Sequence, residues 1–327
     1  MTLLYSQTKA ISLPDSNGWI RPYDWLQIPA LVPGSQVCYL LNAVFPVADN
    51  FIAVWAVGDY TVNWGDGTFE NVASGTTAFK NYNFNNLPAS TATSEGYRQA
   101  LITITPQAGQ DLTQVNLSLP YNQPGLVNSY STGLLEIAIN SPNLNTFFLN
   151  GNASNSPRHR YLQKCTVAEN IVSNWTRTFL LSNSIESVIV NLNSATTMEG
   201  FFQNALPIKR VRLNIPNTVT NFANCFNGAI NLKEITNLNL AGASSSVYLT
   251  GSFNSLRNLS RLQVTGVRFS FSVANCALSR SAIIELFEGL GLSTETPTIN
   301  ISGNYGAASL TTDERNIAIN KGWTITG

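Results

Sequence analysis

Charged side chains are scarce in this sequence. Lysine, arginine, aspartate and glutamate make up 11% of the 327 residues, less than half of the share in an average globular protein. The 18 basic and 18 acidic residues cancel, and no block of one sign stands out. We therefore expect no binding of nucleic acid through a basic face. Polarity comes instead from uncharged side chains, including 39 asparagines, and such a surface suits contacts with proteins, with glycans or within a large assembly.

Histidine and cysteine are also rare. The only histidine is His159, and no C-x-x-C pair occurs among the four cysteines, which are Cys38, Cys165, Cys225 and Cys276. A zinc site needs several such side chains at short spacing, so we expect no metal site and four buried free thiols. The glycine-rich phosphate loops G-x-x-x-x-G-K-[ST] and G-x-G-x-x-G are absent as well, and we expect no cofactor.

Long apolar runs are missing too. No stretch approaches the length that spans a membrane, and the N-terminus MTLLYSQTKAISLPDSNG has no basic start followed by an apolar segment. We therefore expect neither membrane insertion nor a secretory signal. The length suffices for two domains, each with its own core.

Residues 35–120 carry a β pattern. QVCYLLNAVF and NFIAVWAV are apolar runs of strand length, and DYTVNW and QALITITP alternate with period two. Clusters of Gly, Asn, Asp and Ser separate these runs and indicate turns. Several short antiparallel strands with polar turns predict a sandwich of two sheets.

The stretch YTVNWGDGT in this region places Asp66 between two glycines. Gly65 and Gly67 accept positive φ, and Asp66 is able to bond its own backbone, so a turn is the preferred interpretation. Weak calcium binding and catalysis are the alternatives, and no second carboxylate lies at a related spacing for catalysis. Together with FKNYNF and EGYRQALITITP, the stretch resembles the PKD-type immunoglobulin-like sandwich, in which Trp64 would pack across the sheets.

The second half of the chain contains a repeat. The anchors Phe179, Phe202, Phe226 and Phe253 lie 23, 24 and 27 residues apart, and apolar residues recur four before, six after and nine after each of them. These three further columns are Trp175, Met198, Phe222 and Leu249; Ile185, Ile208, Leu232 and Leu259; and Val188, Val211, Ile235 and Leu262. Positions −4 and 0 share one face of a helical turn, whereas +6 and +9 bracket a short strand. The spacing predicts stacked coils, each made of a helical turn and a strand.

The motifs TTMEGFFQNALPIKRVRLNIPN and TVTNFANCFNGAINLKEITNLNL resemble leucine-rich repeats of the BspA type. Asparagine suits the tight corners of such a stack because it tolerates left-handed backbone. Cys225 and Cys276 occupy the same column two coils apart. At about 4.8 Å per coil they would be too distant for a disulfide, which again predicts free thiols.

The last residues, 281–327, are expected to cap the repeats. SRSAIIELFEGLG and LTTDERNIAINK each predict a short helix, the second capped by Thr312, and a final strand follows. The expected fold is thus mainly β with short helices: a PKD/immunoglobulin-like β-sandwich (35–120), a leucine-rich-repeat-like β-solenoid (121–280) and a helical C-terminal cap, preceded by an N-terminal anchoring arm (1–34).

No catalytic, cofactor-binding or metal-binding residue is predicted. His159 lies in the polar stretch SNSPRHRYL, where a solvated loop is expected and a small anion or glycan site at RHR is the alternative; no G-x-S-x-G accompanies it. Glu169, Glu186, Glu199 and Glu234 are scattered, and no pair suitable for glycoside cleavage is favoured among them. Core packing is expected for the tryptophans, which are Trp19, Trp25, Trp55, Trp64, Trp175 and Trp323.

Four stretches resemble structural proteins of tailed phages, notably marine and cyanobacterial ones. They are GWIRPYDWLQIP, YTVNWGDGTFENVASGT, GYRQALITITPQAGQDLTQVNL and TTDERNIAINKGWTIT. The resemblance implies a non-enzymatic virion protein, assembled in the host cytoplasm, that decorates the capsid, forms a head fibre or belongs to a tail appendage. Its expected partners are other virion proteins, further copies of itself, and a host surface glycan or protein. A bacterial cell-surface adhesin is the first alternative, and a tailspike-like glycan hydrolase is the second.

Overall fold

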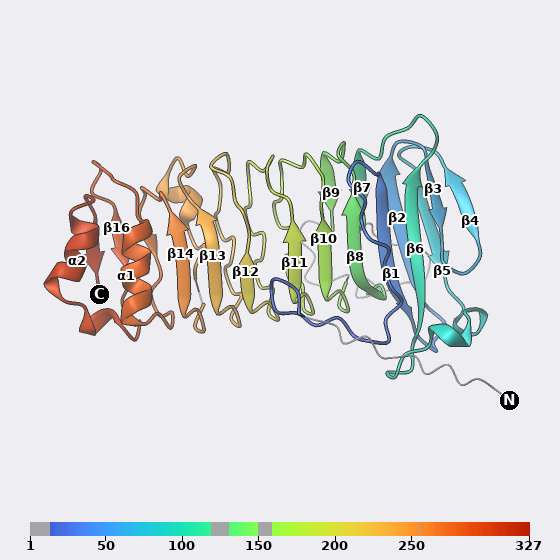
Figure 1. Cartoon of the computed structure of the whole chain (residues 1–327), viewed down its shortest axis with the longest axis horizontal. Coiled ribbons are helices and arrows are strands. Elements are labelled where there is room, and N and C mark those ends of the chain that lie inside the picture. The colour runs from blue at the N-terminus through green and yellow to red at the C-terminus, as the bar shows by residue number, and fades with distance from the viewer. Residues whose placement is uncertain (1–13, 119–130, 150–158, 255) are drawn as a thin grey trace.

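The structure is a computed structural model that describes residues 14–118, 131–149, 159–254 and 256–327. The molecule is elongated, with packed sheets at one end and two α-helices at the other (Figure 1). The larger of two hydrophobic clusters contains residues from Cys38 to Trp323.

Seven strands form the largest sheet, in the order β11-β10-β8-β1-β6-β3-β4. The strands are β1 Val37–Val44, β3 Tyr60–Asn63, β4 Phe69–Val72, β6 Arg98–Pro106, β8 Leu134–Asn140, β10 Lys164–Val167 and β11 Ser187–Val190. β1 pairs antiparallel with both β6 and β8, whereas β8, β10 and β11 run parallel. The sheet therefore combines an antiparallel half with a parallel half.

A second sheet of four strands has the order β5-β2-β7-β9. Its strands are β2 Phe51–Val57, β5 Thr77–Asn81, β7 Gln114–Asn116 and β9 Thr146–Phe148. Alternate side chains of β2, including Val54 and Ala56, enter the same core as Val62 and Ile102 of the first sheet. Period-two alternation thus places one face of each strand in the core.

Two small parallel sheets of three strands each follow along the chain. One contains β12 Arg210–Arg212, β13 Glu234–Asn239 and β14 Arg261–Thr265; the other contains β15 Phe271–Ser272, β16 Thr298–Asn300 and β17 Thr324–Thr326. Short 3-10 helices lie at η1 Phe84–Asn86, η2 Ala89–Thr91, η3 Ser246–Leu249 and η4 Ala307–Ser309.

The expected fold, a sandwich followed by a leucine-rich-repeat-like solenoid with a helical cap, is wrong. The described residues are mainly β with two α-helices, and they form four open sheets rather than one continuous ladder of coils. β1 is the reason at the N-terminal end, because its second edge pairs with β8 and the largest sheet continues past residue 120. Further along, no strand pairing joins β11 to β12 or β14 to β15.

The apolar columns are nevertheless buried as their spacing predicts, and no member of the four columns is more than 3% exposed. The rings of Phe179, Phe202, Phe226 and Phe253 stack nearly parallel at centroid distances of 5.5, 6.0 and 6.1 Å. Stacked aromatic pairs at this distance add to the free energy gained by burial.

No α-helical turn forms around these phenylalanines, although some intervening amides donate three residues back, as that of Leu180 does to Arg177 at 3.2 Å. In the turn stack, defined as residues 174–182, 197–205, 221–229 and 248–254, alternate amides of the first three turns donate to the next turn instead of four residues back. The amide of Trp175 donates to Thr197 and that of Arg177 to Glu199, at 3.0 and 2.8 Å. Arg177 has a φ of 55°, which lies outside the right-handed helical region. The spacing of the apolar side chains therefore predicted their burial correctly, but the backbone path inferred from it was wrong.

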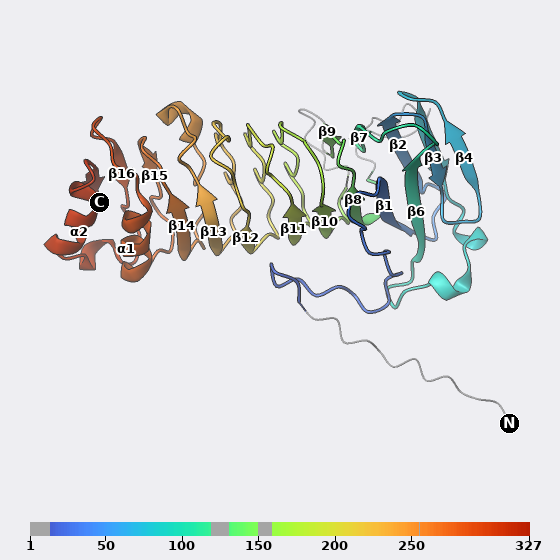
Figure 2. The same ribbon diagram turned by 45° about the horizontal axis from the view of Figure 1, so that its top comes forward.

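Residues 14–34 of the N-terminal arm run alongside the largest sheet (Figure 2). Trp19 and Trp25 are 6% exposed and pack with Leu41 and Leu135 in a second core cluster. The indole of Trp25 also donates to the hydroxyl of Tyr97 at 2.9 Å. Of the expected anchoring arm, residues 14–34 thus lie on the molecule's own sheet, and residues 1–13 fall outside the described residues.

Both predicted α-helices occur. α1 spans Arg280–Gly289 with Ser279 as N-cap, and α2 spans Thr312–Ile319. The N-cap of α2 is Thr311, one residue before the predicted Thr312, because Thr311 forms a reciprocal capping box with Glu314.

Candidate functional site

The Trp-Gly-Asp-Gly segment is a turn, as predicted. Oδ1 of Asp66 accepts hydrogen bonds from the Thr68 amide at 3.0 Å and from its hydroxyl at 2.6 Å, and Oδ2 lies 2.6 Å from Nζ of Lys80. Partial burial acts to raise the pKa of Asp66, but the hydrogen bonds from Lys80 and Thr68 outweigh it and hold the pKa below its ordinary value. Trp64 is buried, as expected. The Asp66 carboxylate therefore stabilises the turn.

Gly65 in this turn has no room for a side chain. Its φ is 74°, and a Cβ there would lie 2.5 Å from the carbonyl oxygen of Leu101. The close approach seats the turn against β6, so the first glycine of the motif is required for packing as well as for backbone conformation.

His159 is buried at 4% exposure, and the expectation of a solvated loop histidine is wrong. Nε2 lies 3.0 Å from the carbonyl oxygen of Leu149, and Nδ1 lies 2.7 Å from Oγ1 of Thr132. Because a carbonyl oxygen only accepts, Nε2 carries the proton, and Nδ1 accepts from the Thr132 hydroxyl. The polar residues around His159 in the sequence gave no sign of this burial. Arg158, part of the alternative RHR site, lies outside the described residues.

Three of the four scattered glutamates are held by separate partners. Oε2 of Glu169 accepts from Nδ2 of Asn140 at 3.0 Å and from the Gly34 amide at 2.6 Å. These two bonds lower the pKa of Glu169, the opposite of what a general acid in glycoside cleavage requires. Glu199 lies 3.5 Å from Arg177 in the turn stack.

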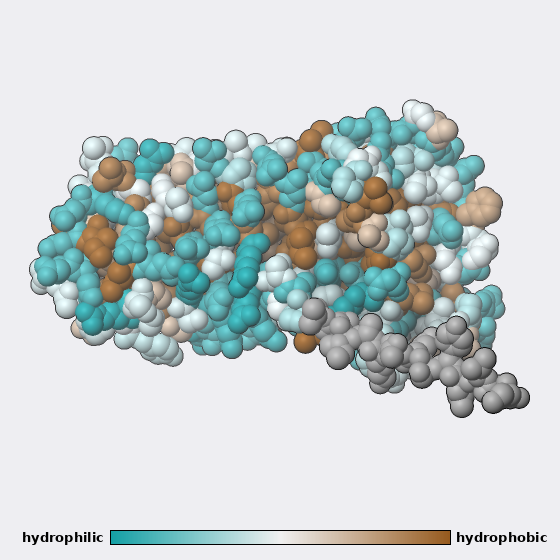
Figure 3. Space-filling model, in the orientation of Figure 1, coloured by the Kyte–Doolittle hydropathy of each residue, from teal (hydrophilic) through white to brown (hydrophobic). Residues whose placement is uncertain are grey.

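Glu234 belongs to a row of charged residues that crosses the outer face of the parallel strands. Arg210, Glu234 and Arg261 occupy matching positions on β12, β13 and β14. Arg210 lies 3.7 Å from Glu234, and Arg261 forms a two-pronged ion pair with Glu285 of α1 at 2.7 and 2.9 Å. Figure 3 shows hydrophilic side chains gathered over these strands. The charges neutralise one another, and each exposed pair contributes at most about 1 kcal/mol.

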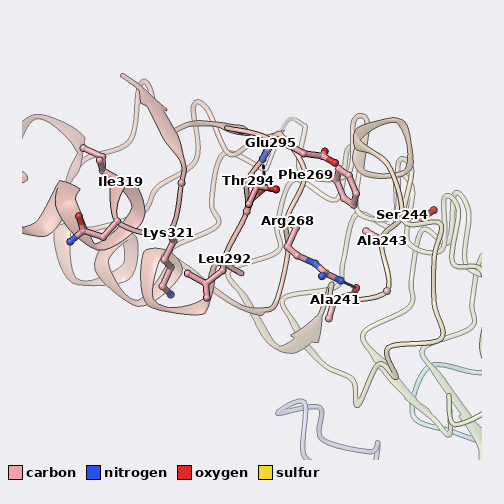
Figure 4. Close-up of a pocket in the computed structure, with 14 residues that line it drawn as sticks. Ala241, Ala243, Ser244, Arg268, Phe269, Leu292, Thr294, Glu295, Ile319 and Lys321 are labelled. Carbon is pink, nitrogen blue, oxygen red and sulfur yellow. Dashed lines mark hydrogen bonds between the residues drawn. The ribbon is translucent and has the colours of Figure 1, made fainter.

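A groove of about 770 Å³ lies between the loops that follow β13 and β14 and the end of α2 (Figure 4). Nζ of Lys321 donates to the carbonyl oxygens of Phe287, Glu288 and Leu290 at the end of α1. Arg268 reaches across to the carbonyl oxygen of Ala241 at 3.2 Å. Both cations thus tie neighbouring turns together. Leu292 and Ile319 remain exposed along the groove, at 75% and 50%.

Exposed phenylalanines are the surface feature that the sequence did not single out. Phe79 on β5 and Phe148 on β9 are 57% and 50% exposed, whereas Phe69 on β4 is 74% exposed. Five of the six tryptophans are buried, as predicted, and Trp55 is partly buried on β2. An outward aromatic on a strand is recognisable only once the inward face is known, because both faces of β2 and β5 carry apolar residues.

All four cysteines are buried and unpaired, as expected. Burial raises the pKa of each thiol, that of Cys276 to about 12. In the part of the chain that the structure describes, no group of three His, Cys, Asp or Glu side chains is placed to hold a metal ion. The helices within the same ranges are all too short or too polar to cross a membrane.

No protein-family model, no curated protein and no solved structure matches this chain.

Proposed function

We propose that this chain is a non-catalytic structural protein on the surface of a phage particle, placed on the capsid or on a tail appendage, and that it acts by binding other virion proteins or the host surface. The observation that carries the proposal is the elongated body, in which the turns of the turn stack, residues 174–254, are bonded to each other. Such a body serves as a spacer that presents its surface at a distance from its attachment point.

The stiffness of the body follows from two repeated contacts. Backbone amides of one turn donate to carbonyl oxygens of the next, as in the bond from Phe202 to Cys225 at 2.7 Å. The stack of nearly parallel phenylalanine rings runs through the same turns, and Phe253 also contacts the tilted ring of Phe271 at a centroid distance of 5.8 Å. Bending the body would break both sets of contacts at once, because interiors packed in this way resist deformation.

The chemistry of the surface also fits a binding protein better than an enzyme. Glu169, Glu199 and Glu234 are each committed to a partner, and the cations of the groove bind backbone carbonyls. The resemblance of GWIRPYDWLQIP and the three further stretches to tailed-phage proteins favours a particle surface as the setting.

The test is immunogold labelling of gradient-purified particles from the source culture, with antibody raised against the full chain. Regular label over heads supports a capsid decoration or head fibre, and label confined to tails supports a tail appendage. Particles that carry neither label nor matching peptides would refute the proposal. Label on the surface of intact, uninfected cells would instead favour the adhesin alternative.

A further inference from the structure

The outer face of the four-stranded sheet β5-β2-β7-β9 lacks charge and carries exposed aromatic rings. The inward positions Ile52, Val54, Ala78, Val115 and Phe147 belong to the core, so the alternate positions point outward. These outward positions are Phe51, Ala53, Trp55 and Val57 on β2; Thr77, Phe79 and Asn81 on β5; Gln114 and Asn116 on β7; and Thr146 and Phe148 on β9. None of them is an acid or a base.

One row of this face crosses all four strands and alternates polar and aromatic side chains. Thr77 is opposite Trp55, Trp55 is opposite Asn116, and Asn116 is opposite Phe148. Phe79 lies in the neighbouring row, opposite Ala53. Neighbouring strands are about 4.8 Å apart, so Trp55 and Phe148, two strands apart, are separated by about 10 Å.

One of the aromatic rings, the indole of Trp55, is held in place by a hydrogen bond. Nε1 of Trp55 donates to the carbonyl oxygen of Gly75 at 2.7 Å, which fixes the edge of the indole at the turn before β5. Phe79 is 57% exposed and Phe148 is 50% exposed. Two exposed rings and one fixed, partly buried indole thus share a face.

The polar groups between the rings are amides and hydroxyls. Oδ1 of Asn116 accepts from the amide and hydroxyl of Ser118 at 2.9 and 2.7 Å, which leaves its NH₂ group directed away from that turn. Gln114 and Thr146 sit opposite each other in the next row. Amides both donate and accept hydrogen bonds, and hydroxyls do the same.

We propose that this face, the aromatic sheet face, binds a chain of uncharged sugars. Apolar C–H faces of pyranose rings match the electron-rich faces of aromatic side chains, and sugar hydroxyls match the amides and hydroxyls between them. An uncharged face complements a neutral glycan and offers no counter-charge to an acidic one. The 10 Å between Trp55 and Phe148 exceeds a single sugar ring, so the ligand is an oligosaccharide or polysaccharide. The inference rests on the proposed function, to which it adds a class of host-surface ligand.

Affinity electrophoresis of the full chain through native gels tests the proposal. The gels contain hydroxyethyl cellulose, glucomannan or dextran as neutral glycans, or alginate as an acidic one. We expect retardation by at least one neutral glycan and none by alginate, with no change between low and high salt, since screening acts on charges only. Phe148→Ala and Trp55→Ala should each weaken the binding roughly tenfold, by analogy with the stacking of bases on aromatic side chains.

Phe69→Ala is the control, because Phe69 is an even more exposed phenylalanine, on β4 of the other sheet. Phe148→Tyr keeps an aromatic ring at a site that is half exposed, and it should bind like the unchanged chain. Retardation that survives Phe148→Ala, or that Phe69→Ala abolishes equally, would overturn the proposal, as would failure of all three neutral glycans. The other possible occupant of this face is a second copy of the chain, which sedimentation velocity without glycan tests. A dimer that Phe148→Ala dissociates would assign the face to that second copy and overturn the glycan proposal. Immunogold label on particles without retardation in the gels would refute the glycan proposal alone. Retardation in the gels without label on particles would refute the virion proposal alone.

Discussion

Single residues with left-handed backbone decide where this chain turns. Asn204, Asn224 and Asn275 have φ between 55° and 58°, a region that asparagine enters more readily than most residues. The high asparagine content pointed to such corners in advance. Other residue-scale expectations failed where the deciding partner is remote in sequence: the buried His159 donates to the carbonyl oxygen of Leu149 and accepts from the hydroxyl of Thr132, and neither residue neighbours it along the chain.

At this scale Asp66 links turn stability to pH. Its folded pKa is lowered, so the stabilisation is complete above about pH 4, the ordinary value for an unfolded aspartate, and disappears as pH falls through the lower folded value. Asp66→Asn should cost about 1 kcal/mol at pH 7, because the contacts to Lys80 and Thr68 weaken. Urea unfolding at several pH values measures this difference, which should shrink below pH 4. Glu95→Gln, at an exposed position, is the control, and an equal loss at pH 3 and pH 7 would contradict the assignment.

Gly242 tests how closely neighbouring turns approach. A Cβ at this position would lie 2.0 Å from the carbonyl oxygen of Asn217 and 2.5 Å from that of Val219. Both are backbone atoms, so Gly242→Ala should force the turns apart and lower the free energy of unfolding by about 1–3 kcal/mol. Ser244→Ala, two residues away at an exposed position, should change it by less than about 0.5 kcal/mol. Equal urea midpoints for the two variants would show that the turns tolerate a wider spacing.

At the scale of elements, side-chain spacing and backbone path separate. The four apolar columns predicted burial correctly, because burial requires only that the chain return to the same core once in each repeat. It does not require a particular backbone path between the columns. The helical turn was inferred from the same spacing, but Arg177 and Leu181 have positive φ, and the amides of Phe179 and Leu181 donate to the next turn. Neither residue type signals left-handed backbone, so the sequence could not reveal this path.

Phe226 is the element-scale test because it lies in the middle of the ring stack, between Phe202 and Phe253. Phe226→Ala should lower the free energy of unfolding by about 3–5 kcal/mol, since it removes a ring that is 1% exposed and leaves a cavity. Phe226→Leu keeps most of the volume and should cost less than half as much. Urea unfolding measures the loss for both variants, provided that the slope of the unfolding free energy against urea concentration stays constant. Phe69→Ala on the surface should have almost no effect. A loss below about 1 kcal/mol for Phe226→Ala would mean that the stack carries little of the stability.

For the whole molecule, the decisive contacts are those that a local pattern cannot encode. The two halves of the chain were separable by their sequence periods, two in the first and about 24 in the second. In the structure β1 pairs with β8 over six residues of its length, from Val37 to Asn42, and the arm residues Trp19 and Trp25 cover both strands. Pairing between strands almost a hundred residues apart depends on which edge of β1 is left open. Nothing in either strand's own alternation specifies that edge.

This shared sheet predicts that the two halves unfold together. Val54→Ala in the N-terminal sheets and Phe226→Ala in the turn stack alter positions in different sheets and turns, yet both lie in one hydrophobic cluster. If the cluster behaves as one cooperative unit, calorimetry should show a single transition, and each variant should shift it as a whole. Tryptophan fluorescence and far-ultraviolet circular dichroism should then report the same midpoint. Two transitions, each displaced by only one of the variants, would show instead that the halves are separate units despite the pairing of β1 with β8.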